Sequence, residues 1–285
     1  MNKKEQQRIV TSDLIQNYRK YLEEQEKSPA TIKNYLHGLT LLQEFIDGMP
    51  VTKQALIAWK AQLTGRYAAA SVNTMLAAAN GFMSYCGWEE CRVKPLKIQR
   101  DLFCKEDREL TRQEYLRLVR AAERRDNQRL SLVLQAICST GIRVSELRFI
   151  TAEAVSAGRA VVNSKGKIRT VFLPGRLKQA LTAYMRNQKR RSGPVFITRT
   201  GKPIDRSNIW RDMKSLCESA GVEPGKVFPH NLRHLFARTY YSLEKDLSRL
   251  ADILGHTSVS TTRIYTMESG AVHRGQIERM GLVIT

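Results

Sequence analysis

Proteins that depend on disulfides and proteins that cross membranes have sequence features that are scarce in this chain. Its cysteines are few, odd in number and scattered: Cys86, Cys91, Cys104, Cys138 and Cys217. This pattern predicts reduced thiols rather than a disulfide framework or a zinc site. No apolar run is long enough to span a bilayer, and no cationic leader precedes one. We therefore expect a cytoplasmic protein with no membrane partner.

Motifs for nucleotides and metals are also missing. The sequence contains no Gly-rich phosphate loop of the Walker type. No cluster of Asp and Glu accompanies the five histidines, which are His37, His230, His234, His256 and His273. We expect no metal and no cofactor, and chemistry that runs without a nucleotide fuel.

Acidic residues are in the minority, with 27 Asp and Glu against 47 Lys and Arg, which gives a formal charge of +20. Residues 1–104 hold 14 basic and 10 acidic side chains, a net of +4, so residues 105–285 carry the remaining +16. Such a balance is typical of proteins that bind phosphate-rich partners. Charge alone does not distinguish DNA from RNA or from a membrane surface.

The length of 285 residues allows two domains. Residues 10–100 show helical periodicity throughout. Ser28 followed by Pro29 predicts a helix start, and Gly48 with Pro50 predicts its end. Two more helices are expected near 53–63 and 69–85. The small and short polar side chains of 68–74 suit a close approach to a groove.

The second half of the chain mixes helices with one hairpin. The segment 92–108 has mixed charges and little periodicity, and we place a linker at 101–109. Thr111 followed by Glu114 predicts a capping box that opens the next domain. Residues 160–163 and 168–173 read as two strands joined by the turn 164–167, and 195–197 could add another strand. The fold class expected is mainly α with a small β-hairpin or sheet.

A tyrosine lies nine residues after a histidine in the segment 254–266, LGHTSVSTTRIYT, and HNLRH stands upstream at 230–234. This pairing indicates attack of Tyr265 on a phosphodiester. The transition state carries extra negative charge on the non-bridging oxygens and needs fixed donors. Arginine grips two oxygens without losing its charge, and histidine can also move protons. On a helix His230 and Arg233 would be neighbours, as a phosphate clamp requires.

Two further elements strengthen that interpretation. The segment 140–147, TGIRVSEL, places Arg143 at the start of an expected helix, after a glycine that allows a sharp entry. Lys165, at the tip of the predicted hairpin, can reach a DNA groove and protonate a leaving 5′-oxygen. By itself each element fits a solvated surface, and their combination favours chemistry on DNA.

Together these segments resemble three sequence boxes of the tyrosine site-specific recombinases, the phage-integrase family, in their compact Xer-like form. TGIRVSEL resembles the first arginine box, HNLRH the His-x-Leu-Arg-His box, and 254–265 the closing box with the nucleophile. The three boxes occur in the family order and at family spacing, and the resemblance covers nearly the whole chain.

The resemblance implies a role for each matching residue. Tyr265 would be the nucleophile, forming a 3′-phosphotyrosine bond. Arg143 and Arg233 would bind the scissile phosphate. His230 would transfer protons or bind the phosphate, and His256 would hydrogen-bond it.

Two further roles follow from the resemblance. Glu146 would support the arginines without taking part in the chemistry. Lys165 would assist the departing 5′-hydroxyl. The family's hairpin usually reads Gly-Lys-Gly-x-Lys, whereas this chain has Ser-Lys-Gly-Lys at 164–167, one residue shorter. We favour Lys165, and Lys167 is the alternative.

The resemblance also implies the organisation of the chain. Residues 1–100 would form a helical core-binding domain and 110–285 the catalytic domain with a C-terminal tail. The partner would be double-stranded DNA with inverted-repeat core sites, bound by a homotetramer that exchanges tails. Integration, excision, inversion and dimer resolution are all compatible with the sequence.

Two other functions are compatible with parts of the sequence. One is an architectural DNA-binding protein that kept the fold and lost catalysis, and the other is a relaxing topoisomerase with the same phosphotyrosine chemistry. The complete set of site residues argues against decay, and the Xer-like layout argues against the topoisomerase.

Overall fold

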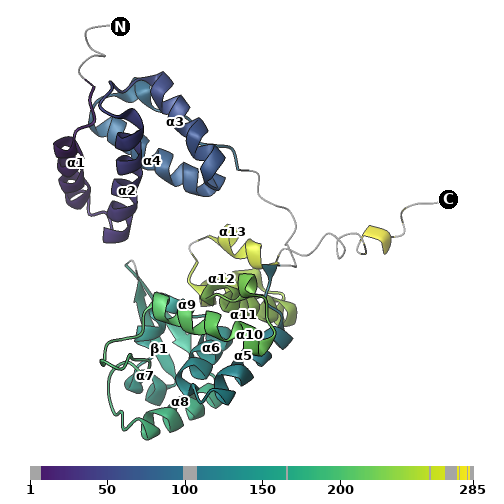
Figure 1. The fold of residues 1–285 in the computed structure, drawn as a ribbon. Helices are drawn as coiled ribbons and strands as arrows, with labels where there is room; N and C mark the ends of the chain where they lie inside the picture. Colours follow the sequence, from purple (N-terminus) through teal and green to yellow (C-terminus); the bar gives the residue numbers. More distant parts are fainter. Residues whose placement is uncertain are drawn as a thin grey trace. The chain divides into compact units, whose positions relative to one another are not determined.

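Helices dominate the structure, a computed structural model that describes residues 8–98, 108–164, 166–256, 258–266, 275, 277–280 and 282. The chain divides into two units, Met1–Arg100 and Asp101–Thr285 (Figure 1). Across the described residues the strands form one two-stranded sheet in the second unit. The expected fold class, mainly α with a small hairpin, is confirmed.

The first unit is a helical bundle. Its described elements are α1 (Ser12–Glu24), α2 (Pro29–Ile46), α3 (Lys53–Arg66), α4 (Ala69–Tyr85) and the 3₁₀ helix η1 (Glu89–Cys91). Its core is apolar and includes the fully buried Leu39, Leu42, Leu56, Trp59 and Phe82. Apolar side chains three and four residues apart meet on one face of each helix, so burying that face assembles the bundle.

Local signals place the ends of α2. The Ser28 hydroxyl accepts a hydrogen bond from the Thr31 amide at 3.3 Å, and Pro29 begins the helix. Proline costs nothing there because its missing N–H would have had no partner in the helix. The helix ends at Ile46, and Asp47 takes a left-handed conformation with φ of 47°.

Residues 92–98 extend the first unit. The side chain of Asn80 donates to the Val93 carbonyl at 2.8 Å and accepts from the Val93 amide at 2.9 Å. Asn73 makes the same pair of bonds with Leu96, at 2.9 and 2.7 Å. Residues 93–96 are therefore bonded to the first unit and precede the linker expected at 101–109, and the Asn73 side chain serves the unit itself.

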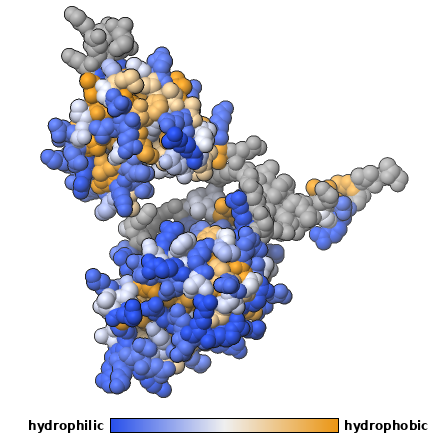
Figure 2. Space-filling model, in the orientation of Figure 1, coloured by the Kyte–Doolittle hydropathy of each residue, from blue (hydrophilic) through white to orange (hydrophobic). Residues whose placement is uncertain are grey.

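The second unit alternates helices with the hairpin. Its described elements are α5 (Arg112–Arg124), α6 (Gln128–Thr140), η3 (Val144–Phe149), α7 (Ala152–Ala157), β1 (Arg159–Ser164), β2 (Lys167–Phe172), α8 (Gly175–Asn187), α9 (Arg206–Ser215), α10 (Cys217–Ala220), η4 (Pro224–Lys226), α11 (Pro229–Glu244), α12 (Leu247–Leu254), α13 (Val259–Thr262) and η5 (Arg263–Thr266). Hydrophilic residues cover most of its visible face (Figure 2).

The second unit opens as the sequence predicts. Thr111 and Glu114 form a capping box at the start of α5, so each side chain bonds to the other's backbone amide. The last residues of the expected linker already contact this unit. The Arg108 carbonyl accepts from Asn231, and the Glu109 carboxylate pairs with Arg238. Residues 101–107 lie outside the described residues.

The hairpin pairs β1 and β2 antiparallel, with Arg159 opposite Phe172 and Ser164 opposite Lys167. One face buries Val162 and Val171, so the register is fixed by the alternation of the strands. The expected additional strand at 195–197 is absent from this sheet. Instead, the Val195 amide donates to the Ile150 carbonyl at 2.9 Å, and Ile197 forms an isolated bridge.

Helices α6 and α11 form the centre of the second unit. Helix α6 is buried on most sides, including Leu134, Ala136 and Ile137, and α11 packs against it. A helix that is apolar nearly all round belongs in a core. This packing brings the end of α6 beside α11 and thereby positions the site.

Candidate active site

Arg143 follows a sharp turn at the end of α6. Gly141 ends the helix with φ of 64°. A Cβ added to this glycine would lie 2.5 Å from the Phe236 ring, so both the backbone and the space require glycine. Arg143 then caps η3, so a helix begins where the sequence predicted one, and it is a 3₁₀ helix. Its side chain is 39% exposed, the most open of the arginines in this cluster.

Glu146 is a buried carboxylate, 1% exposed, that binds two arginines. Its Oε1 accepts from Arg143 Nη1 at 2.9 Å, and its Oε2 accepts from the Arg143 amide at 3.0 Å. Arg169 Nη2 donates to the same Oε2 at 2.5 Å. A carboxylate is acceptor-only, so three donors satisfy it without conflict.

The ionisation of Glu146 follows from these contacts. Burial alone would raise its pKa, but the bond from the Arg143 amide and the charges of Arg169 and Arg143 outweigh burial. The pKa of Glu146 therefore lies below its ordinary value, and the carboxylate is charged at neutral pH.

Arg169 was not among the residues that the sequence selected. It lies on β2, and its side chain is 13% exposed. Besides Glu146 it binds the Ile253 carbonyl through Nη1 at 2.7 Å. Its partners are 23 and 84 residues distant in sequence. No local motif signals a pairing over such separations.

Arg233 lies in the second turn of α11 and is 1% exposed. Its Nη1 donates to the Gly141 carbonyl, and its Nη2 donates to the Leu254 carbonyl at 2.7 Å. Tyr265 lies close enough to raise the pKa of this guanidinium, although burial outweighs that effect. Burial, followed by the charge of Arg143, lowers its pKa to about 10, so the guanidinium remains protonated at neutral pH.

His256 follows α12 and lies against Arg233. Its Nε2 is 3.1 Å from Arg233 Nη2, and its Nδ1 is 2.9 Å from the Thr262 hydroxyl. Because a guanidinium can only donate, Nε2 accepts and the ring proton is on Nδ1. Burial and then the charge of Arg233 lower the pKa of His256 to about 4, which agrees with a neutral ring.

Tyr265 is 4% exposed and is surrounded by imidazole rings. The His234 ring meets it edge to face with centroids 4.6 Å apart. The His256 ring stacks on it at 5.7 Å, and the His230 centroid is 6.4 Å away. Tyr265 also belongs to a small apolar cluster with Leu250 and Leu254. The expected nucleophile thus lies beside both the second arginine and the histidines.

His230 and His234 are one helical turn apart on α11, with ring centroids 4.6 Å apart. Desolvation, and then the charge of Arg233, lowers the pKa of His230 below its usual value of about 6.5. Burial and then the charge of His230 lower the pKa of His234 to about 4. Both rings are therefore neutral at pH 7. Within the described part of the chain, no third ligand makes this pair a metal-binding group.

The predicted lysine lies outside the described residues. Lys165 itself is not described, nor is the side chain of Lys167. The backbone of the turn is described on either side, and Gly166 has φ of 73°, which only glycine adopts without cost. The hairpin that carries both lysines is anchored to the site through Arg169.

The structure thus gathers six of the seven selected residues in one place: Arg143, Glu146, His230, Arg233, His256 and Tyr265. Sequence reasoning missed three contributors. Arg169 and Thr262 contact the site through long-range or loop geometry, and His234 stood in the motif HNLRH without a role. The arrangement presents guanidinium donors, neutral imidazoles and a tyrosine hydroxyl to one anionic group.

Comparison with known proteins identifies the family of the chain. Residues 108–270 match the Phage integrase family, and residues 15–90 match the Phage integrase, N-terminal SAM-like domain. The chain is 28% identical to Tyrosine recombinase XerA of Pyrococcus furiosus, over 97% of each chain. It is 30% identical to Tyrosine recombinase XerC of Roseiflexus castenholzii, over 86% of this chain and 85% of that one.

Solved structures show the same fold. A lambda integrase fragment, residues 75–356, bound as a dimer to a COC′ core site, has a TM-score of 0.75 at 17% identity, over 92% of this chain and 96% of that one. XerH bound to its difH substrate has a TM-score of 0.71 at 20% identity, over 96% of this chain and 85% of that one.

Among the described residues no helix is long and apolar enough to cross a bilayer.

Proposed function

This chain belongs to the phage integrase family and is a tyrosine recombinase, and from that premise we propose that it cuts and rejoins double-stranded DNA through a covalent bond between Tyr265 and a DNA 3′-phosphate. The observation that carries this proposal is the position of Tyr265. Its side chain lies among three imidazole rings, one of which, His256, is bonded to the buried guanidinium of Arg233.

The reaction is a transesterification. The Tyr265 oxygen attacks phosphorus, a bond from phosphorus to the tyrosine oxygen forms, and the bond from phosphorus to the 5′-oxygen breaks. The tyrosine proton moves to a neutral imidazole, a role we assign to His230, whose lowered pKa favours the unprotonated ring that can accept it. The 5′-oxygen leaves with a proton. Rejoining reverses these steps, so the bond energy is kept and no nucleotide is consumed.

The arginines stabilise the transition state. Arg143 is the more exposed of the two and meets the incoming phosphate, while Arg233 is fixed by two carbonyls and His256. Donors held in place before the reaction cost no reorganisation as charge develops on the phosphate oxygens. Glu146 holds Arg143 in its orientation. His256 binds Arg233 first, because its Nε2 accepts a hydrogen bond from that guanidinium. In this tautomer Nε2 carries no proton, so it is not available to donate to a phosphate.

A lysine supplies the proton that the leaving 5′-oxygen takes. We assign this role to Lys165 of the hairpin tip, with Lys167 as the alternative. Single substitutions decide between them, because loss of the general acid slows cleavage of a normal 5′-hydroxyl leaving group by about 10²–10⁴-fold. A DNA with a 5′-sulfur leaving group needs no such acid. Only the true general-acid variant regains cleavage on that DNA.

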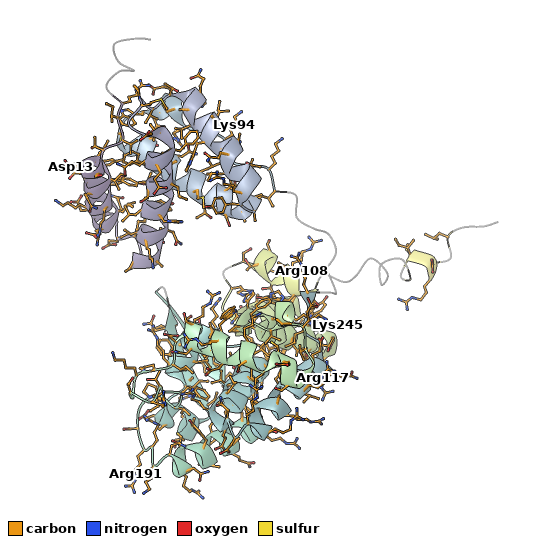
Figure 3. All side chains as sticks on the ribbon, viewed as in Figure 1. Asp13, Lys94, Arg108, Arg117, Arg191 and Lys245 are labelled. Carbon is orange, nitrogen blue, oxygen red and sulfur yellow. The ribbon has the colours of Figure 1, made fainter. Side chains whose placement is uncertain are left out.

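DNA is the partner proposed for the basic surface. Of the net charge of +20, residues 105–285 carry +16. Arg117 and Lys245 are among the basic side chains of the second unit (Figure 3). We assign residues 1–100 as the core-binding domain and 110–285 as the catalytic domain, acting in the cytoplasm on inverted-repeat core sites.

Assembly completes the proposal. Two DNA sites would be joined by a homotetramer that exchanges C-terminal tails, of which only scattered positions, such as the exposed Leu282, are described. Deleting residues 282–285 is expected to weaken recombination and assembly while monomer DNA binding is kept. Unchanged recombination would refute tail exchange alone.

The test of the chemistry is covalent trapping. The protein is mixed with nicked genomic DNA fragments, from which the cut strand end diffuses away, and DNA that stays on the protein in SDS is recovered and sequenced. We expect a recurrent inverted repeat with the native chain and no adduct with Tyr265→Phe, although that variant binds DNA normally.

Tyr240→Phe is the matched control, because Tyr240 lies on α11 in the same apolar cluster and loses the same hydroxyl. Its adduct yield is expected to equal that of the native chain. Tight DNA binding by the native chain without an adduct would favour an architectural protein over a recombinase.

A further inference from the structure

We propose that Arg169 is a positioning residue for DNA cleavage. It holds the hairpin and the turn before His256 in place around Arg143. The inference rests on the proposed function, since it concerns the same site. Arg169 belongs to none of the three sequence boxes, and its side chain is placed only by the fold.

Arg169 joins three segments that are distant in sequence. From β2 its guanidinium reaches the Glu146 carboxylate of η3 at 2.5 Å and the Ile253 carbonyl in the last turn of α12 at 2.7 Å. Its side chain is 13% exposed, and that of Glu146 is 2% exposed. Charge-assisted bonds of this kind are short and directional, so they fix the mutual position of the three segments.

The backbone at Gly255 is shaped to admit this side chain. Gly255 ends α12 with φ of 64°. A Cβ at this position would lie 2.4 Å from Arg169 Cδ and 2.8 Å from its Nε. The glycine therefore serves two needs, a left-handed backbone and room for the arginine stem. The turn that leads to His256 closes directly over Arg169.

Arg169 binds close to both acceptors that orient Arg143. Arg143 donates to Glu146 Oε1 at 2.9 Å and to the Gly255 carbonyl at 3.4 Å. Arg169 binds the other oxygen of Glu146 and the carbonyl of Ile253, two residues before Gly255. Removing Arg169 would leave Glu146 with only its bonds from Arg143 and would remove the bond to the Ile253 carbonyl, so the direction of Arg143 toward the phosphate would be less firmly fixed.

The test measures single-turnover cleavage of nicked DNA that carries the site recovered by covalent trapping. The variants are Arg169→Gln, which removes the charge, and Arg169→Lys, which keeps it. The control is Arg191→Gln, which removes the same charge from an exposed position far from the hairpin and α12 (Figure 3). Because misplacing a reacting group by 1 Å can cost about 100-fold, we expect Arg169→Gln to lower the cleavage rate on the order of 100-fold with its DNA Kd within about twofold.

Arg169→Lys is expected to recover part of that rate, because an ammonium can pair with Glu146 but does not hold the Ile253 carbonyl at the same time. The pH profile separates positioning from a loss of folded protein. Without Arg169 the carboxylate loses a charge that lowers its pKa, so the acidic limb of cleavage by Arg169→Gln shifts to higher pH. The folded fraction is measured by circular dichroism at each pH, and the cleavage rate is divided by it, so that the remaining shift reports positioning alone.

A double-mutant cycle with Gly255→Ala tests the contact itself. In the native background the added Cβ collides with the Arg169 stem and slows cleavage. In the Arg169→Ala background that collision is gone, and Gly255→Ala costs much less. If the two effects multiply as independent changes, the proposed contact does not act in catalysis.

The outcomes separate this inference from the proposed function. If the native chain and Arg191→Gln form no adduct, the recombinase proposal fails. If they cleave, and Arg169→Gln cleaves within about threefold of them with an unshifted pH profile, only the positioning role is overturned. Should Arg169→Gln not fold, Arg169→Lys decides: a native rate and profile contradict the role, and a reduced rate with native DNA binding supports it.

Discussion

Replacing Glu146 by glutamine probes the arginine cluster with almost no change in shape. The native carboxylate accepts three hydrogen bonds, two from Arg143 and one from Arg169. An amide offers one oxygen, and its NH₂ group faces a donor. Glu146→Gln therefore loses charge compensation and also places donors against donors.

The loss in the free energy of unfolding depends on how deeply each ion pair of Glu146 is buried. Arg143 is 39% exposed, so solvent screens its pair with Glu146, and that pair contributes only about 0–1 kcal/mol. Arg169 is 13% exposed and Glu146 2%, and breaking such a buried pair costs about 3–5 kcal/mol. We expect Glu146→Gln to lower the free energy of unfolding of the second unit by roughly 3 kcal/mol. Whole domains have only about 5–15 kcal/mol, so the change is large.

The difference in the free energy of unfolding between the native protein and Glu146→Gln must also depend on pH. The pKa of Glu146 is lowered in the folded state, so its ionisation stabilises the fold above its unfolded pKa of about 4.3. That contribution is lost as the pH falls through the lowered pKa. Glutamine does not titrate, so the difference in the free energy of unfolding between the two proteins should become smaller in acid.

Hydrogen exchange of the α6 amides, read by mass spectrometry, reports the stability of the second unit within the full chain. The matched control is Glu218→Gln, which removes an exposed carboxylate of α10. It should change the free energy by less than about 0.5 kcal/mol. A cost for Glu146→Gln below about 1 kcal/mol, or one that stays constant with pH, would refute the buried-pair reasoning.

Three other perturbations test the fold and the partner. Gly141→Ala strains a left-handed backbone and meets the Phe236 ring, so chemical unfolding should show a loss of about 2–4 kcal/mol, whereas Gly158→Ala, with open space around it, should lose only about 1–2 kcal/mol. Asn80→Ala removes both bonds to Val93 and should speed hydrogen exchange across residues 92–98, with no change in α6. DNA affinity, measured by fluorescence anisotropy, should fall about 10³-fold or more between 50 and 200 mM salt, as it does when at least six phosphates are bound. A flat salt dependence would contradict a phosphate-based interface.

Local signals predicted much of the fold. The capping box at Thr111 and the start of α2 at Pro29 depend on residues within four positions of each other, so the sequence reveals them directly. The hairpin was equally visible because its strands alternate. The helix that begins after Arg143 was also predicted, but its 3₁₀ geometry was not, since the contacts of Arg143 with Glu146 and the burial of Leu147 impose it.

The site was predictable only where residues occur in boxes. Arg233, His256 and Tyr265 stand in recognisable segments, and the fold places them together. Arg169 could not be selected, because its role depends on a carboxylate and a carbonyl that only the tertiary structure brings to it. The roles of these residues in cleavage remain predictions until they are measured.

The central claim is that Tyr265 becomes covalently bound to DNA. The most direct measurement is mass spectrometry of the trapped adduct after digestion with nuclease and trypsin. Cleavage after Arg263 and Arg274 yields a peptide of residues 264–274 in which Tyr265 is the only tyrosine. We expect this peptide to carry a nucleotide phosphate on Tyr265. A phosphate on another residue, or an unmodified peptide from protein that has cleaved DNA, would contradict the account.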